Sequence, residues 1–209
     1  MPGRLLTVAT KNTEEPRRPY ELGKRLEQME ESRAAILRAA RSQLEANGYR
    51  HLTMGWLAAE SGVTRQTIHN LFGTKAGVLD ALFDLIALDG GMESMRNVMT
   101  LPSTEAMLEG FVEVFCRFWS SNRMLLRRIH GIGAIDPEFG TVIEARNAGR
   151  YGAARRIVSR MGGGDLMERA SALTALTSFE FFDALAGNLR DEKRAAAVAL
   201  DLARKMLGG

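Results

Sequence analysis

The sequence has few of the residues on which several protein classes depend. One cysteine, Cys116, and three histidines occur among 209 residues, so an internal disulfide is excluded and no zinc-ligand spacing exists. The neighbouring Phe115 and Phe118 indicate that Cys116 is a small buried apolar residue, with a redox sensor as the alternative. We expect no metal site and no cofactor.

Long apolar runs are also missing. None approaches the roughly 18 residues of a membrane-spanning helix, and residues 4–9 are too short for the core of a signal peptide. The hydrophobic content of 45% is that of a soluble chain with a sizeable core. We therefore expect a cytoplasmic protein without a membrane partner.

Catalytic constellations are absent as well. His51, His69 and His130 lie far apart in the sequence, and Gly131 and Gly133 lack the third glycine and the preceding strand of a nucleotide-binding loop. Acidic residues are scattered among basic ones, which is typical of solvated helix faces. We do not expect an enzyme. A small helical enzyme or carrier remains the alternative that turnover without DNA affinity would support.

Strand patterns are missing, whereas signals for helices recur. No segment alternates in the β-branched manner of a strand. Asp136 precedes Pro137 as an N-cap, and Asp165 with Glu168 forms a capping box. Residues 103–121 carry an apolar stripe at helical spacing. The expected fold is all-α, with an N-terminal three-helix domain and a C-terminal helical domain.

The most informative segment is Thr53–Lys75, TMGWLAAESGVTRQTIHNLFGTK, which contains two short helices joined by a glycine turn. Gly62 supplies the positive φ of a sharp turn, and Ala58 leaves room for a crossing helix. Thr53 and Thr64 are expected N-caps whose hydroxyls satisfy amides of the first turn. The inward positions are Leu57, Val63, Ile68 and Leu71. This pattern predicts a DNA-reading helix-turn-helix.

The second helix of this segment leaves polar residues outward. Arginine suits guanine O6 and N7, and glutamine or asparagine suits adenine N6 and N7. An ordinary solvated helix face is the alternative. The outward residues are Arg65, Gln66, Thr67, His69 and Asn70.

Charge is distributed unevenly along the chain. Twelve basic and nine acidic residues fall in the first eighty, which accounts for the whole net charge of +3. This asymmetry favours a polyanionic partner such as DNA. Residues 1–27 contain three of the five prolines without apolar periodicity, and we expect a flexible arm there. Arg17 and Arg18 could reach DNA from it, and an uninvolved tail is the alternative.

Residues 32–85 resemble the TetR family of bacterial transcriptional regulators. The features that agree are a helix ending in Asn47–Gly48–Tyr49, the helix-turn-helix, and Phe72–Gly73–Thr74–Lys75 opening a further helix. The resemblance implies that Thr53 and Lys75 hold phosphates and that the helix 64–72 enters the major groove. His69 stands where many members carry tyrosine. The expected domains are 28–75 for DNA binding and 76–209 for effector binding and dimerisation.

Aromatic residues of the C-terminal domain could enclose a pocket for a small, mainly apolar effector. Packing of the core is the alternative for each of them. His130 could add a polar contact. The candidate pocket residues are Met107, Phe111, Phe115, Trp119, His130, Phe179 and Phe182.

Two alanine-rich helices are expected near the C-terminus, at about 165–186 and 191–206. The resemblance implies that the last two helices form a four-helix bundle with a second copy, so that two recognition helices meet one palindrome. Alanine-rich helices also occur inside monomer cores. The hypothesis is a homodimeric, ligand-responsive repressor that binds double-stranded DNA. A ligand-independent factor is the alternative, and the lack of an enclosed apolar cavity would favour it.

Overall fold

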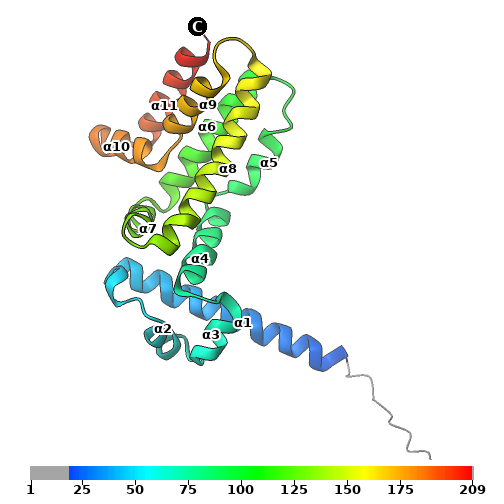
Figure 1. The fold of residues 1–209 in the computed structure, drawn as a ribbon, viewed down its shortest axis with the longest axis vertical. Coiled ribbons are helices and arrows are strands. Elements are labelled where there is room, and N and C mark those ends of the chain that lie inside the picture. The colour runs from blue at the N-terminus through cyan, green and yellow to red at the C-terminus, as the bar shows by residue number, and fades with distance from the viewer. Residues whose placement is uncertain (1–18, 209) are drawn as a thin grey trace, which may run out of the picture.

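The computed structural model describes residues 19–208 (Figure 1). This part of the chain forms eleven α-helices and two short 3-10 segments and contains no strand, which confirms the all-α prediction. None of its helices is long and apolar enough to cross a membrane. The helices are α1 (Pro19–Ala46), α2 (Met54–Ser61), α3 (Arg65–Phe72), α4 (Lys75–Asp89), α5 (Met95–Val98), α6 (Thr104–Ser121), α7 (Arg123–Ile135), α8 (Pro137–Met161), α9 (Leu166–Leu176), α10 (Phe179–Leu189) and α11 (Glu192–Leu207), with the 3-10 segments Tyr49–His51 and Met92–Ser94.

The arm expected at residues 1–27 is helical from Pro19 onward, because α1 begins there. Arg17 and Arg18 lie outside the described residues. Helix α1 packs against α2 and α4, and it also contacts α7 of the C-terminal half.

The helix-turn-helix is built from the predicted caps and turn. The hydroxyl of Thr53 accepts from the amide of Trp56 at 3.1 Å, and the hydroxyl of Thr64 accepts from the amide of Thr67 at 3.0 Å. Gly62 ends α2 with a φ of 70°, in the left-handed region that glycine tolerates. The N-caps and the glycine turn are therefore confirmed.

Helix α6 forms the centre of the C-terminal half. The helix packs against α8, α11, α7 and α10 (Figure 1). Its apolar side chains are buried. Cys116 is buried here, and burial raises the pKa of its thiol to about 12, so the group stays protonated. The predicted caps of α8 and α9 are confirmed, because Asp136 accepts from the amide of Phe139 and Asp165 from that of Glu168.

The single helix expected at about 165–186 is two helices in the structure, α9 and α10. The indole of Trp119 donates to the carbonyl of Thr177 at 3.0 Å, so a group from α6 takes a backbone acceptor at the break. Ser178 then caps α10 by accepting from the amide of Phe181 at 3.1 Å. The chain therefore ends in three helices, where the sequence predicted two.

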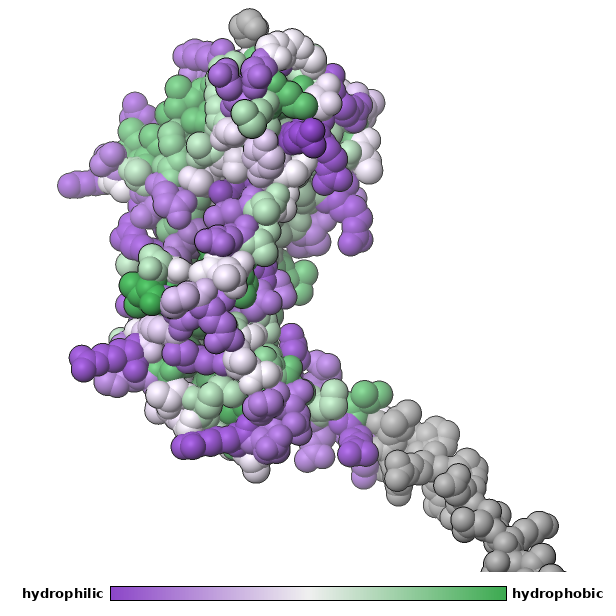
Figure 2. Space-filling model, viewed as in Figure 1, coloured by the Kyte–Doolittle hydropathy of each residue, from purple (hydrophilic) through white to green (hydrophobic). Residues whose placement is uncertain are grey.

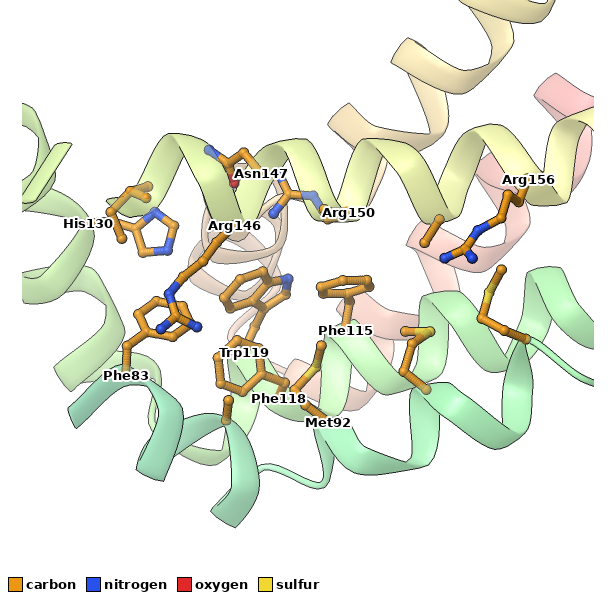
Figure 3. Close-up of a pocket in the computed structure, with 16 residues that line it drawn as sticks. Phe83, Met92, Phe115, Phe118, Trp119, His130, Arg146, Asn147, Arg150 and Arg156 are labelled. Atoms are coloured by element: carbon orange, nitrogen blue, oxygen red, sulfur yellow. The ribbon is translucent and has the colours of Figure 1, made fainter. Parts of the chain in front are cut away.

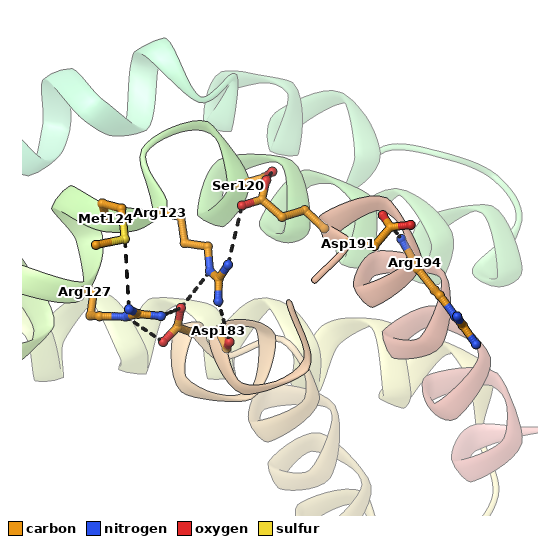
Figure 4. Close-up of polar contacts among 8 residues, drawn as sticks. Ser120, Arg123, Met124, Arg127, Asp183, Asp191 and Arg194 are labelled. Carbon is orange, nitrogen blue, oxygen red and sulfur yellow. Dashed lines mark hydrogen bonds and ion pairs between the residues drawn. The ribbon is translucent and has the colours of Figure 1, made fainter. Parts of the chain in front are cut away.

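A cluster of charged side chains fastens α10 to α7 (Figure 4). Arg123 donates through Nε to one carboxylate oxygen of Asp183 at 2.7 Å, and Arg127 donates to both oxygens at 2.7 and 3.0 Å. Arg123 also donates to the backbone carbonyl of Asp183 at 2.8 Å. Because Asp183 is mostly buried, this paired arrangement fixes the position of α10 on α7.

Candidate nucleic-acid interface and ligand pocket

Helix α3, which we call the recognition helix, lies at the end of the molecule opposite the C-terminus (Figure 1). Ile68 is fully buried and holds the helix to the domain core. Its candidate DNA-binding residues face outward: Arg65, Gln66, His69 and Asn70 are exposed and Thr67 is half-buried.

Two contacts position side chains of the recognition helix, one within the helix and one to α2. The amide of Gln66 donates to the amide oxygen of Asn70 at 2.9 Å, so the two candidate base-reading groups are held side by side. The guanidinium of Arg65 lies against Gly55 of α2, where a Cβ would overlap it. Sequence reasoning missed this role of Gly55, although a glycine inside a helix costs stability relative to alanine and can have a packing reason.

The two expected phosphate-binding residues differ in their surroundings. Thr53 is exposed at the start of α2. Lys75, at the start of α4, lies with Nζ 3.9 Å from a carboxylate oxygen of Asp136 and 3.9 Å from the centroid of the Tyr49 ring. About a third of its side chain is exposed. The cation thus sits where the DNA-binding half meets the N-terminus of α8.

Two hydrogen bonds join that N-terminus to the DNA-binding half. The hydroxyl of Tyr49 donates to the carboxylate of Asp136, and the hydroxyl of Thr74 donates to Glu138 at 2.6 Å. The bond from Tyr49 is the main reason why the pKa of Asp136 lies below its usual value. Burial, together with this carboxylate, raises the pKa of Tyr49. We call this set of contacts the junction.

A cavity of about 320 Å³ lies in the C-terminal half, between α4, the segment 92–99, α6, α7 and α8 (Figure 3). This volume is in the range of pockets that enclose small organic ligands. Aromatic rings form one part of its wall and methionines another. The apolar lining residues include Phe83, Phe115, Phe118, Trp119, Met92, Met95, Met99 and Ile143.

Three candidate effector residues, Phe115, Trp119 and His130, line this cavity. The others are buried in the core and do not line it. Phe179 packs behind the wall, with its ring centroid 5.6 Å from that of Trp119 and 4.6 Å from that of His130. The remaining candidates away from the cavity are Met107, Phe111 and Phe182.

Polar lining residues come chiefly from α8, and sequence reasoning missed them. Arg146 and Arg150 are four residues apart and therefore share one helix face, which is turned to the cavity. Arg146 donates to Asp80 and, at 2.7 Å, to Asp84 of α4. Asn147 and Arg156 also line the cavity.

His130 closes the side of the cavity formed by α7. Its Nδ1 lies 2.9 Å from the carboxylate of Glu180 on α10, and this hydrogen bond lowers the pKa of Glu180 to about 2. The opposite ring nitrogen, Nε2, is buried and has no hydrogen-bond partner among the described residues. Glu180 thereby holds His130 in place, and Nε2 of the ring stays free to form a hydrogen bond.

The chain therefore combines a helix-turn-helix domain with a C-terminal helical domain that holds a partly open cavity. Residues 36–82 match the family model of bacterial regulatory proteins of the tetR family. The match lies within the N-terminal part of the chain, and the chain as a whole shares the fold of solved TetR-family transcriptional regulators.

Solved structures of this fold cover most of the chain. A TetR transcription regulator from Haloarcula marismortui ATCC 43049 shares 16% identity at a TM-score of 0.65, covering 86% of this chain and 97% of that one. The SmeT–triclosan complex shares 21% identity at a TM-score of 0.64, covering 83% and 90%. PfmR, a TetR family regulator from Thermus thermophilus, shares 21% identity at a TM-score of 0.56, covering 83% and 94%. No curated protein sequence matches the chain.

Proposed function

We propose that this protein is a ligand-responsive transcriptional repressor that binds a palindromic operator as a homodimer. The observation that carries the proposal is the pairing of an exposed recognition helix with a largely apolar cavity, connected by α4 and α8. Residues 28–75 would bind DNA, and residues 76–209 would bind the effector and the second copy. No catalytic activity belongs to this proposal.

DNA contacts are assigned by chemistry and exposure. Gln66 and Asn70 would read adenine edges, and Arg65 a guanine edge, because their side chains are exposed on the recognition helix. Thr53 and Lys75 would bind phosphates, which position the protein without specifying sequence. Thr64, Thr67 and His69 would supply further contacts from the same surface.

The cavity favours a regulator that responds to a ligand over a ligand-independent DNA-binding factor. Its wall includes aromatic rings that offer apolar surface and methionines that adapt to the shape of an apolar molecule. The SmeT structure, which has the same fold, is a complex with triclosan. Binding would change the spacing of α4 and α8 and thereby move the DNA-binding half.

The face formed by α10 and α11 is the proposed dimer interface. Figure 2 shows hydrophobic residues gathered over these two helices, at the upper left of the view. Phe181, Leu185 and Leu189 recur every four residues on α10 and are only partly buried, and Leu202 on α11 is exposed. Exposed apolar patches of this kind usually mark an interface.

The first test is selection of duplexes from a random DNA library by the purified protein at moderate salt. We expect enrichment of an inverted repeat whose half-sites lie about one helical turn apart, roughly 34 to 36 Å. Retention without a shared motif would indicate a nonspecific DNA-binding factor. No retention would reject the proposed function.

Variants then separate the two classes of contact on the selected operator. Lys75→Ala is expected to weaken binding to all sequences and to reduce the slope of log affinity against log salt by about one. Gln66→Ala is expected to relax the preference at one base pair and to leave the salt slope unchanged. If the two results are exchanged, the contact assignment is wrong.

A further inference from the structure

We propose that the effector is an amphipathic anion, a carboxylate with an apolar body, and that Arg150 binds its charged group. This inference rests on the proposed function, because it names the chemical class of the molecule that fills the cavity. It changes the expectation of a mainly apolar effector by adding one negative charge.

Arg150 is a buried cation that points into the cavity. It lies on the middle of α8, is 9% exposed, and extends toward the rings of Trp119 and Phe115 (Figure 3). Burial lowers the pKa of its guanidinium, yet arginine keeps its charge in proteins. A buried charge is costly unless it is paired and hydrogen-bonded.

The described residues provide no such partner. Nε of Arg150 makes no hydrogen bond among them, and no carboxylate forms an ion pair with the guanidinium. The guanidinium makes a cation–π contact with Phe115, whose ring centroid lies 5.7 Å from Cζ of Arg150. Glu180 acts on Arg150 only electrostatically, because the carboxylate of Glu180 is hydrogen-bonded to His130.

The other charged residues that line the cavity are also cations. Arg146 and Arg156 also line it, and no acidic residue does. Arg146 differs from Arg150, because Asp80 and Asp84 of α4 already neutralise it. Nε of both Arg146 and Arg150 lacks a hydrogen-bond partner among the described residues, and Arg156 is exposed. Arg150 is therefore the buried lining cation without a carboxylate partner among the described residues, and a carboxylate fits its planar donor group.

Other groups suit the rest of such a molecule. The unused Nε2 of His130 is a second polar atom for the head group. Aromatic and methionine side chains would enclose the apolar body. A cationic ligand would meet Arg146, Arg150 and Arg156 together, and a neutral ligand would leave Arg150 unpaired.

The test compares ligands that share a body and differ in their head group. Decanoate, 1-decanol and decylammonium are titrated against the full chain carrying the neutral fluorophore N-phenyl-1-naphthylamine, and loss of its fluorescence is measured. We expect decanoate to displace the fluorophore at a concentration at least about tenfold lower than 1-decanol, and decylammonium to be the weakest. Equal displacement by decanoate and 1-decanol, or no displacement by decanoate, overturns the proposal.

Variants locate the charge. Arg150→Met should weaken decanoate at least about tenfold and leave the fluorophore and 1-decanol unchanged, whereas Arg150→Lys should keep part of the preference. Arg155→Met is the matched control, since Arg155 is exposed on the same helix and does not line the cavity. Equal weakening of all ligands by Arg150→Met would assign a structural role to Arg150. If that variant does not fold, the preference of the natural chain for decanoate over 1-decanol still tests the proposal.

Failure of this inference is distinct from failure of the proposed function. A protein that selects an inverted repeat but does not prefer decanoate contradicts only the anion. A protein that prefers decanoate and retains no DNA contradicts the regulator and leaves the anion site in place.

Discussion

Gly77, in the first turn of α4, is a residue for which the structure allows no side chain. A Cβ there would overlap the backbone carbonyl oxygen of Phe72, the last residue of the recognition helix. We expect Gly77→Ala to lower the free energy of unfolding by about 1–3 kcal/mol, because backbone must shift. Urea unfolding measures it. Gly131→Ala in α7 is the control, since a Cβ there meets nothing within 4 Å and should be neutral or mildly stabilising.

The hydrogen bond from Tyr49 to Asp136 gives the junction a defined pH dependence. Since the pKa of Asp136 is lowered in the folded state, its contribution to stability is complete above the unfolded pKa of about 4 and is lost as pH falls through the lowered value. We expect Tyr49→Phe to cost about 1 kcal/mol of unfolding free energy at about pH 7, and clearly less at about pH 2. Urea unfolding at both values tests this. An equal cost at both would show that the ionised carboxylate is not the partner.

At the residue scale, prediction from sequence succeeded where the cause is local. The caps at Thr53 and Thr64 depend on a hydroxyl three residues before an amide, which a sequence shows directly. Arg150 and Arg155 look alike in sequence, yet one is buried and the other is exposed. Their difference arises from the helices that pack on α8, which local sequence does not specify.

Helix α8 connects the two ends of the molecule. Its first turn makes the junction contacts, and its middle carries Arg146 into the cavity wall. Because Arg146 also binds Asp80 and Asp84 of α4, a ligand in the cavity would alter the contact between α8 and the helix that leads to the DNA-binding half. Coupling between the two sites needs such a shared element.

Arg146→Met tests this connection. We expect the variant still to bind operator DNA, with the loss of operator affinity caused by a bound ligand reduced at least about fivefold, the lower end of typical coupling between two sites. Fluorescence anisotropy of a labelled operator, with and without a ligand that displaces the fluorophore, measures the ratio. Arg155→Met should keep the full ratio. Unchanged coupling in Arg146→Met would exclude this ion pair from the path.

At the element scale, the sequence predicted the helical class and missed the break between α9 and α10. The alanine-rich pattern continues across residues 170–186, so helix propensity alone favours one helix there. At the break the indole of Trp119 donates to the carbonyl of Thr177, a contact between residues 58 positions apart, and Ser178 caps the helix that follows. The candidate pocket residues show the same limit, because helical spacing identifies buried side chains but not which of them border a cavity.

On the scale of the whole molecule, one chain carries one recognition helix, while a palindrome offers two half-sites. In the proposed function, full affinity for a palindromic operator therefore requires two copies held at a fixed spacing. Ligand binding would weaken operator binding by changing that spacing. By linkage, operator DNA must weaken ligand binding by the same factor.

In the proposed homodimer, the face formed by α10 and α11 holds the two copies together. Leu202 is 38% exposed on α11, and in a two-fold interface a charge placed there would face the same charge or an apolar surface of the partner. We expect Leu202→Glu to sediment as a monomer at micromolar concentration and to lose at least about tenfold in operator affinity. Leu88→Glu is the control, because Leu88 is 61% exposed on α4, away from this face. If Leu202→Glu remains a dimer with full affinity, the two copies meet through a different surface, and the apolar residues over α10 and α11 need another partner.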